Sequence, residues 1–190
     1  MNTDSINEYN LKNLSYKRQK HIEGVRDTAI KLADIYGEDK EKAEIAALFH
    51  DMFRGLDESV LNYYVKHLGL GIKYMNNCNL AHGKIAAIIM ERDYGITDED
   101  VLNAVKFHTT GRADMSILEK IVFMADAIEP NRVYPGVEEI REIAYKNLDK
   151  ACLISICRTI AYVQSKGQYL DNDTILARDF FIKKEKINGK

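Results

Sequence analysis

The chain has 190 residues, which suits one domain and is long enough to bury a hydrophobic core. Hydrophobic residues make up 46% and charged residues 29%, as in ordinary globular proteins. The formal net charge of −2 gives no basic field that would attract nucleic acid or anionic lipid. We predict a single domain over residues 1–190, with a core at about residues 16–182 and short flexible termini.

Three features of the sequence indicate a cytoplasmic protein. The N-terminus lacks the charged and apolar regions of a signal peptide. No apolar run approaches the roughly 18 residues that a membrane span needs. The cysteines Cys78, Cys152 and Cys157 form no CxxC pair, and their odd number suits buried thiols in a reducing compartment.

Helical periodicity dominates the chain from end to end. Apolar residues recur at steps of three and four, no segment shows sustained alternation, and only two prolines interrupt the pattern. The sequence therefore predicts an all-α fold. The expected helices cover residues 16–36, from 39 to 50, 57–68, 80–94, from 97 to 108, from 116 to 128, 137–145, 148–166, and from about 173 onward.

Capping signals mark several of these helix ends. Gly37 and Gly95 are expected C-terminal stops, and Thr97 and Ser116 are expected N-caps. The C-terminal part of the helix that starts at Asp39 is apolar on nearly all sides, which predicts a central position in the fold.

Four histidines and two aspartates lie at helix ends or on apolar helix faces. Each histidine alone is explained better by a cap or a surface position. Asp126 is more informative, because a carboxylate in a buried apolar stripe needs a cation, a metal or several donors. Imidazole and carboxylate ligands together suit iron, manganese, cobalt or zinc, and the number of ligands allows two metals if one carboxylate bridges. The candidate ligands are His21, His50, Asp51, His82, His108 and Asp126.

The order of these residues resembles the HD-domain metal-dependent phosphohydrolases. Longer strings resemble the YqeK-type bacterial symmetrical diadenosine tetraphosphate hydrolases over nearly the whole chain. The strings His-Thr-Thr-Gly and Asp-x-Ile-Glu-Pro-x-Arg are more specific than the His-Asp pair alone. The matching segments are residues 18–25, 46–51, 81–83, 103–112 and 125–132.

The resemblance implies a single HD-domain helical bundle with iron ions in its core, a possible homodimer, and cleavage of diadenosine tetraphosphate into two ADP molecules. Matched position by position, one metal takes His21, His50, Asp51 and Asp126, and the other shares Asp51 and adds His82 and His108. The chain departs from the family at Arg54, where lysine is usual, and at Asp179, where asparagine is usual. Both departures bear on nucleotide preference.

Two metals a few Å apart can generate a hydroxide near neutral pH and hold phosphoryl oxygens. We hypothesise that Asp51 bridges the metals and that a metal-bound hydroxide attacks a phosphoryl group in line. Arg54 and Arg132 would then neutralise charge on the transferred or leaving phosphate.

Further substrate contacts are weaker candidates. Thr109 and Gly111 could offer a hydroxyl and a backbone N–H to phosphate, although a helix stop explains them equally well. Thr174 and Arg178 lie one helical turn apart and could reach the nucleotide, or could serve as an N-cap and a surface arginine. Lys84 is expected on the surface.

Three functions are compatible with the pattern. The first is symmetrical hydrolysis of diadenosine tetraphosphate and related dinucleoside polyphosphates. The second is hydrolysis of a nucleoside mono- or triphosphate, because neither the fold nor the metals fix the substrate. The third is a non-catalytic module that senses metal and nucleotide, which the complete ligand set disfavours. No nucleic acid or membrane partner is expected.

Overall fold

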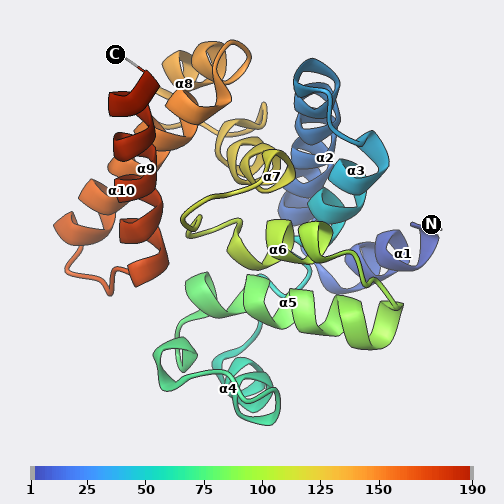
Figure 1. Ribbon diagram of the computed structural model, residues 1–190. Coiled ribbons are helices and arrows are strands. Elements are labelled where there is room, and N and C mark those ends of the chain that lie inside the picture. Colours follow the sequence, from blue (N-terminus) through green and yellow to red (C-terminus); the bar gives the residue numbers. More distant parts are fainter. Residues whose placement is uncertain (1–2, 189–190) are drawn as a thin grey trace.

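A computed structural model describes residues 3–188, and this part of the chain contains α-helices and one 3₁₀ helix but no strand (Figure 1). The all-α prediction is confirmed. The helices are α1 (Asp4–Asn13), α2 (Tyr16–Tyr36), α3 (Lys40–Phe49), α4 (Glu58–His67), η1 (Ile72–Tyr74), α5 (Cys78–Tyr94), α6 (Glu99–Phe107), α7 (Ile117–Ile128), α8 (Val137–Ala144), α9 (Leu148–Ser165) and α10 (Asn172–Asn188).

Helix α3 lies at the centre of the fold, as its sequence predicts. Its N-terminus is capped by Asp39, whose Oδ1 accepts from the backbone N–H groups of Glu41 and Lys42 at 2.8 and 3.2 Å. Six of its residues are buried, and the helix packs against α2, α6 and α7. Because α3 is covered on several sides, the residues that follow it begin inside the protein.

Helix α7 is the second buried element. Ser116 and Glu119 form a reciprocal capping box at its start, and Pro130 follows its end. Nine of its residues are buried, because it lies between α2, α6 and α9. Helices α3 and α7 therefore carry their polar residues into the interior, where each needs a partner.

Two helix starts differ from the prediction. Helix α5 begins at Cys78, two residues before the expected start, because the Asn77 side chain accepts from Leu80 N at 3.3 Å. The N-cap of α6 is Asp98 and not Thr97, since the Asp98 carboxylate accepts from the backbone N–H groups of Asp100 and Val101. In both places the side chain just before the helix accepts from backbone N–H groups that have no partner within the helix.

The N-terminal helix α1 was not predicted. Its residue Ile6 is 1% exposed, and the Asn10 amide donates to the carbonyl of Leu48 at 3.0 Å. The hydrophobic core therefore extends to a segment that the sequence analysis placed in a flexible terminus.

Helices α8, α9 and α10 pack side by side at one end of the molecule, whereas α4 and α5 lie at another (Figure 1). Two ion pairs join the start of α10 to η1 and α5: Lys73–Asp171 at 2.9 Å and Lys84–Asp173 at 3.5 Å.

The expectation that Lys84 lies on the surface is wrong. Its side chain is buried, with Nζ 3.7 Å from the centroid of the Phe107 ring, and burial lowers its pKa to about 8.

The three thiols differ in exposure. Cys152 is buried and Cys78 half-buried, but Cys157 is exposed, so the expectation of buried thiols is wrong for Cys157. None of the helices between residues 3 and 188 combines the length and the apolar character that crossing a membrane requires.

Candidate active site

The fold brings the six candidate metal ligands together in one place. They come from α2, α5, α7 and the residues that directly follow α3 and α6. The four histidines and Asp51 are buried, and the Asp126 side chain is 22% exposed. The gathered residues are His21, His50, Asp51, His82, His108 and Asp126.

One group of ligands faces Oδ2 of Asp51. The Nε2 atoms of His21 and His50 both lie 3.5 Å from this oxygen, and they are 3.4 Å from each other. Oδ1 of Asp126 lies 3.0 Å from the same Nε2 of His21. Two imidazole nitrogens and two carboxylate oxygens thus surround one point.

A second group faces the other carboxylate oxygen. Oδ1 of Asp51 lies 3.1 Å from His82 Nε2 and 3.9 Å from His108 Nε2. The two imidazole nitrogens are 2.9 Å apart. Asp51 therefore has one oxygen in each group, which is the geometry expected of a bridging carboxylate.

Backbone carbonyls hold three of the histidine rings in one orientation. The Nδ1 atoms of His50, His82 and His108 donate at 2.6–2.7 Å to the carbonyls of Ala47, Cys78 and Val105. These bonds place the proton on Nδ1 and direct the Nε2 lone pair toward the cluster.

This orientation leaves an excess of acceptors. With the protons on Nδ1, the Nε2 atoms of His82 and His108 face each other with lone pairs, and the nearby Asp51 oxygen is also an acceptor. Lone pairs at this distance repel each other unless a cation lies between them. Imidazole nitrogen and carboxylate oxygen are good ligands for divalent transition metals, so the cluster fits such ions.

The electrostatics favour these protonation states at His108 and Asp51, whereas Asp51 and Asp126 raise the pKa of His50 against the effect of its burial. Burial, together with the neighbouring His82 and His50, lowers the pKa of His108 to about 3, so this ring stays neutral near pH 7. Burial opposes ionisation of Asp51, but His50 and His82 hold its pKa well below the usual range. A neutral imidazole and an ionised carboxylate are the forms that bind metal.

Glu129 orients the fourth histidine and was not predicted as a site residue. Its Oε1 lies 3.1 Å from His21 Nδ1, and its Oε2 accepts from the backbone and side-chain N–H groups of Asn131 at 2.6 and 3.0 Å. Gly24 makes room for it, because a Cβ at that position would lie 2.5 Å from Oε2 of Glu129. The segment 125–132 contains Glu129, but no pattern in the sequence indicates that this side chain faces His21.

Two arginines bring positive charge to the carboxylates. Arg132, a predicted catalytic residue, donates from Nε to the carbonyl of Asp126 at 2.7 Å and from Nη2 to its carboxylate. Arg18 Nη1 lies 2.5 Å from Oδ2 of Asp51, a contact that the sequence analysis missed. Both guanidinium groups lie beside the cluster in positions from which they can contact an anionic substrate.

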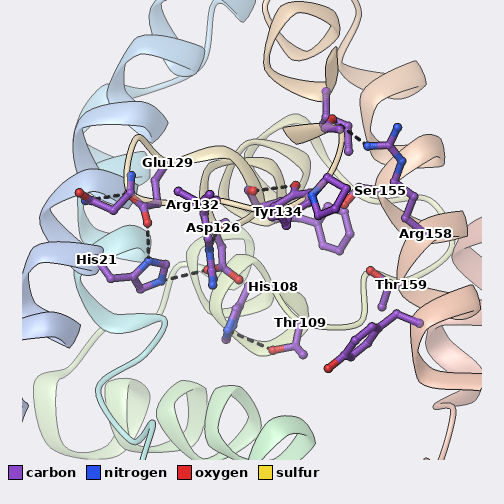
Figure 2. Close-up of a pocket in the computed structure, with 18 of the residues that line it drawn as sticks. His21, His108, Thr109, Asp126, Glu129, Arg132, Tyr134, Ser155, Arg158 and Thr159 are labelled. Carbon is purple, nitrogen blue, oxygen red and sulfur yellow. Dashed lines mark hydrogen bonds and ion pairs between the residues drawn. The ribbon is translucent and has the colours of Figure 1, made fainter. Parts of the chain in front are cut away.

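A cleft of about 1450 Å³ adjoins this cluster. His21, His108 and Asp126 line one end, and residues of α9 line the other (Figure 2). Thr109, a predicted substrate contact, also lines the cleft, with its hydroxyl 3.1 Å from His108 Nε2. The volume is large enough for a nucleotide-sized ligand.

The HD domain family model matches residues 18–131, which include all six clustered ligands. The chain belongs to the HD domain family. A relative from Bacillus subtilis, named symmetrical bis(5'-nucleosyl)-tetraphosphatase, is 37% identical over 170 residues, 89% of this chain and 91% of the relative. A relative of the same name from Halalkalibacterium halodurans is 42% identical over 163 residues, 85% of this chain and 87% of the relative.

A solved structure supports the same assignment for the fold. It is described as a predicted HD superfamily hydrolase involved in NAD metabolism from Clostridium acetobutylicum. It is 46% identical, has a TM-score of 0.91, and the match covers 97% of this chain and 98% of the other. The HD domain assignment is therefore supported by both sequence and three-dimensional structure.

Four predicted substrate contacts of this HD domain do not line the cleft. Arg54 is half-buried and donates from its backbone N–H to the carbonyl of Asp51 at 2.8 Å. Gly111 is buried in a left-handed conformation (φ 62°) four residues beyond the C-terminal end of α6, and its backbone N–H donates to the carbonyl of Phe107 at 2.8 Å as part of the helix stop. Thr174 is buried in the first turn of α10, and Arg178 pairs with Asp179 at 2.7 Å.

Proposed function

We propose that this HD-domain protein is a metal-dependent hydrolase that splits diadenosine tetraphosphate symmetrically into two molecules of ADP. The observation that carries the proposal is the position of Asp51, with one carboxylate oxygen in each histidine group beside a nucleotide-sized cleft. We infer the substrate from the names of the relatives from Bacillus subtilis and Halalkalibacterium halodurans.

The proposal assigns the ligands to two divalent ions. One ion takes His21, His50, Asp51 and Asp126, and the other takes Asp51, His82 and His108. Two such ions, when bound, lower the pKa of water and polarise phosphoryl oxygens. We propose iron as the metal on the basis of the family resemblance, although the same ligands accept manganese, cobalt or zinc.

The chain itself contributes charge and orientation. Arg18 and Arg132 lie beside the two carboxylates and line the cleft, so their guanidinium groups can bind the tetraphosphate oxygens bidentately. The Thr109 hydroxyl lines the cleft beside His108, so it can donate to a phosphate oxygen there. Arg54, Gly111, Thr174 and Arg178 are not part of this proposal, because they do not line the cleft.

Product analysis tests the proposal directly. The protein is incubated anaerobically with ferrous or manganous ion and diadenosine tetraphosphate, and the nucleotides are separated by chromatography. ADP as the sole product supports symmetrical cleavage. ATP with AMP would mean that a different phosphorus is attacked, and no cleavage with metal bound would contradict the assigned substrate.

We also propose that the protein is a cytoplasmic single-domain enzyme that forms a homodimer. The single domain is supported by one connected core that includes side chains from Ile6 to Phe181. The dimer is implied by the family resemblance alone. Light scattering during size-exclusion chromatography tests it, because a mass near 21.7 kDa would indicate a monomer.

A further inference from the structure

The two ends of the cleft differ in chemistry. The end beside the metal ligands is charged and polar, with Arg18, Arg132 and Asn131 in its lining. The other end is lined by α9, with the hydroxyl groups of Ser155 and Thr159 and the ring of Tyr162. A nucleotide has the same division, because its phosphates are anionic and its base is flat and largely apolar.

One face of α9 lines this second end of the cleft. Ser155, Thr159 and Tyr162 follow each other at steps of four and three residues, so they share one side of the helix. In Figure 2, Ser155 and Thr159 lie across the cleft from His21. Tyr162 lines the cleft but is 60% exposed, which leaves much of its ring free to contact a ligand.

The wall beside this face is held by hydrogen bonds. Arg158 donates to the carbonyl of Gly136 at 2.8 Å and to the Glu139 carboxylate at 2.7 Å. The Tyr134 hydroxyl donates to the carbonyl of Ala127 at 2.9 Å. The loop between α7 and α8 is thereby fixed against α9, so this end of the cleft is formed before a ligand binds.

We propose that the α9 end of the cleft, defined by Tyr134, Ser155, Thr159 and Tyr162, binds one nucleoside of the substrate. The base stacks on the Tyr162 ring, and the ribose hydroxyls bond to Ser155 and Thr159. This inference rests on the proposed function, because phosphates held by Arg18 and Arg132 direct one nucleoside along the cleft toward α9. An aromatic face suits any base, and hydroxyl groups suit a ribose.

Binding and kinetics of Tyr162→Ala test this subsite. The variant should weaken ADP binding about tenfold by calorimetry, since it removes one base–aromatic stack. Binding of inorganic pyrophosphate, which has no base, should stay within twofold. With diadenosine tetraphosphate as substrate, the KM should rise by more than kcat falls, and Tyr162→Phe should restore the KM because it keeps the ring.

Tyr169→Ala is the matched control. Tyr169 is similarly exposed, at 56%, but does not line the cleft, so its loss should leave both ligands and the KM unchanged. If Tyr162→Ala behaves like Tyr169→Ala, or weakens pyrophosphate as much as ADP, the nucleoside subsite is wrong. If the wild type binds ADP through Tyr162 but does not cleave diadenosine tetraphosphate, the subsite stands and the proposed substrate is wrong.

Discussion

Oε1 of Glu129 lies 3.1 Å from Nδ1 of His21, although the two residues are 108 positions apart in the sequence. The contact fixes the ring of the one clustered histidine that no backbone carbonyl holds. A carboxylate in this position also makes the imidazole a stronger ligand. Glu129→Gln keeps an acceptor but removes the charge, so metal affinity should fall about 10- to 100-fold, as measured by anaerobic titration.

Glu119→Gln is the matched control for this substitution. Glu119 is buried in the first turn of α7, the helix that ends just before Glu129, but it pairs with Arg112 and caps α7 instead of contacting a histidine. Its loss should lower the free energy of unfolding while the folded protein keeps its metal affinity. Equal metal affinity in Glu129→Gln and the wild type would show that Glu129 has no part in the site.

Gly83 is required where α5 crosses α6. A Cβ at this position would lie 2.7 Å from the carbonyl oxygen of Val105, the same oxygen that accepts from His108 Nδ1. Gly83→Ala should lower the free energy of unfolding by about 1–3 kcal/mol, despite the better helix propensity of alanine. It should also reduce the metal bound by the folded protein, because the His108 ring is displaced.

Chemical denaturation and metal analysis measure these two effects. Gly71→Ala is the comparison, because nothing lies within 4 Å of its added Cβ and its φ is −66°. That variant should match the wild type in both measurements. A Gly83→Ala protein of normal stability and metal content would mean that the two helices can separate at no cost.

Arg132 makes two contacts that a lysine cannot reproduce together. Its guanidinium bonds to both the backbone carbonyl and the carboxylate of Asp126. Arg132→Lys should lower kcat/KM for diadenosine tetraphosphate about 10- to 100-fold, since it loosens a carboxylate that we assign to a metal. Arg92→Lys, on an exposed arginine that also pairs with a carboxylate, should have no effect. Full activity in Arg132→Lys would contradict the positioning role.

The three cysteines should differ in reactivity. Burial raises the pKa of the Cys152 thiol, so this group stays protonated as the pH rises through the usual value of about 8.5. In the native protein at pH 8, iodoacetamide should label exposed Cys157 first and leave Cys152 unmodified until the chain unfolds. Peptide mass mapping measures both rates, and rapid native labelling of Cys152 would contradict the buried position.

The sequence predicted most of the helices well, because the signals for a helix are local. Helix periodicity and caps are local, so the limits of α2 and the start of α7 could be read directly. The six ligands were proposed from polar residues on apolar faces and from a family resemblance. Their convergence is now visible in the distances around Asp51.

The missed features depend on contacts between distant residues. No residue next to Glu129 in the sequence indicates that it faces His21. The helical pattern around Arg18 predicts a surface side chain, and its contact with Asp51 forms only in the folded protein. Helix α1 has a mixed sequence, and its burial depends on packing of Ile6. Lys84 looked like a surface residue because its partners, Phe107 and Asp173, come from two other parts of the chain.

Metal stoichiometry tests the central claim, that Asp51 joins two metal sites. Metal-free protein is titrated anaerobically with manganous ion, and bound metal is measured per chain. The wild type should bind two ions, His82→Ala one, and Asp51→Ala neither with high affinity, while His67→Ala, outside the cluster on α4, should bind two. Two tightly bound ions in Asp51→Ala, or in His82→Ala, would contradict the bridged two-metal site.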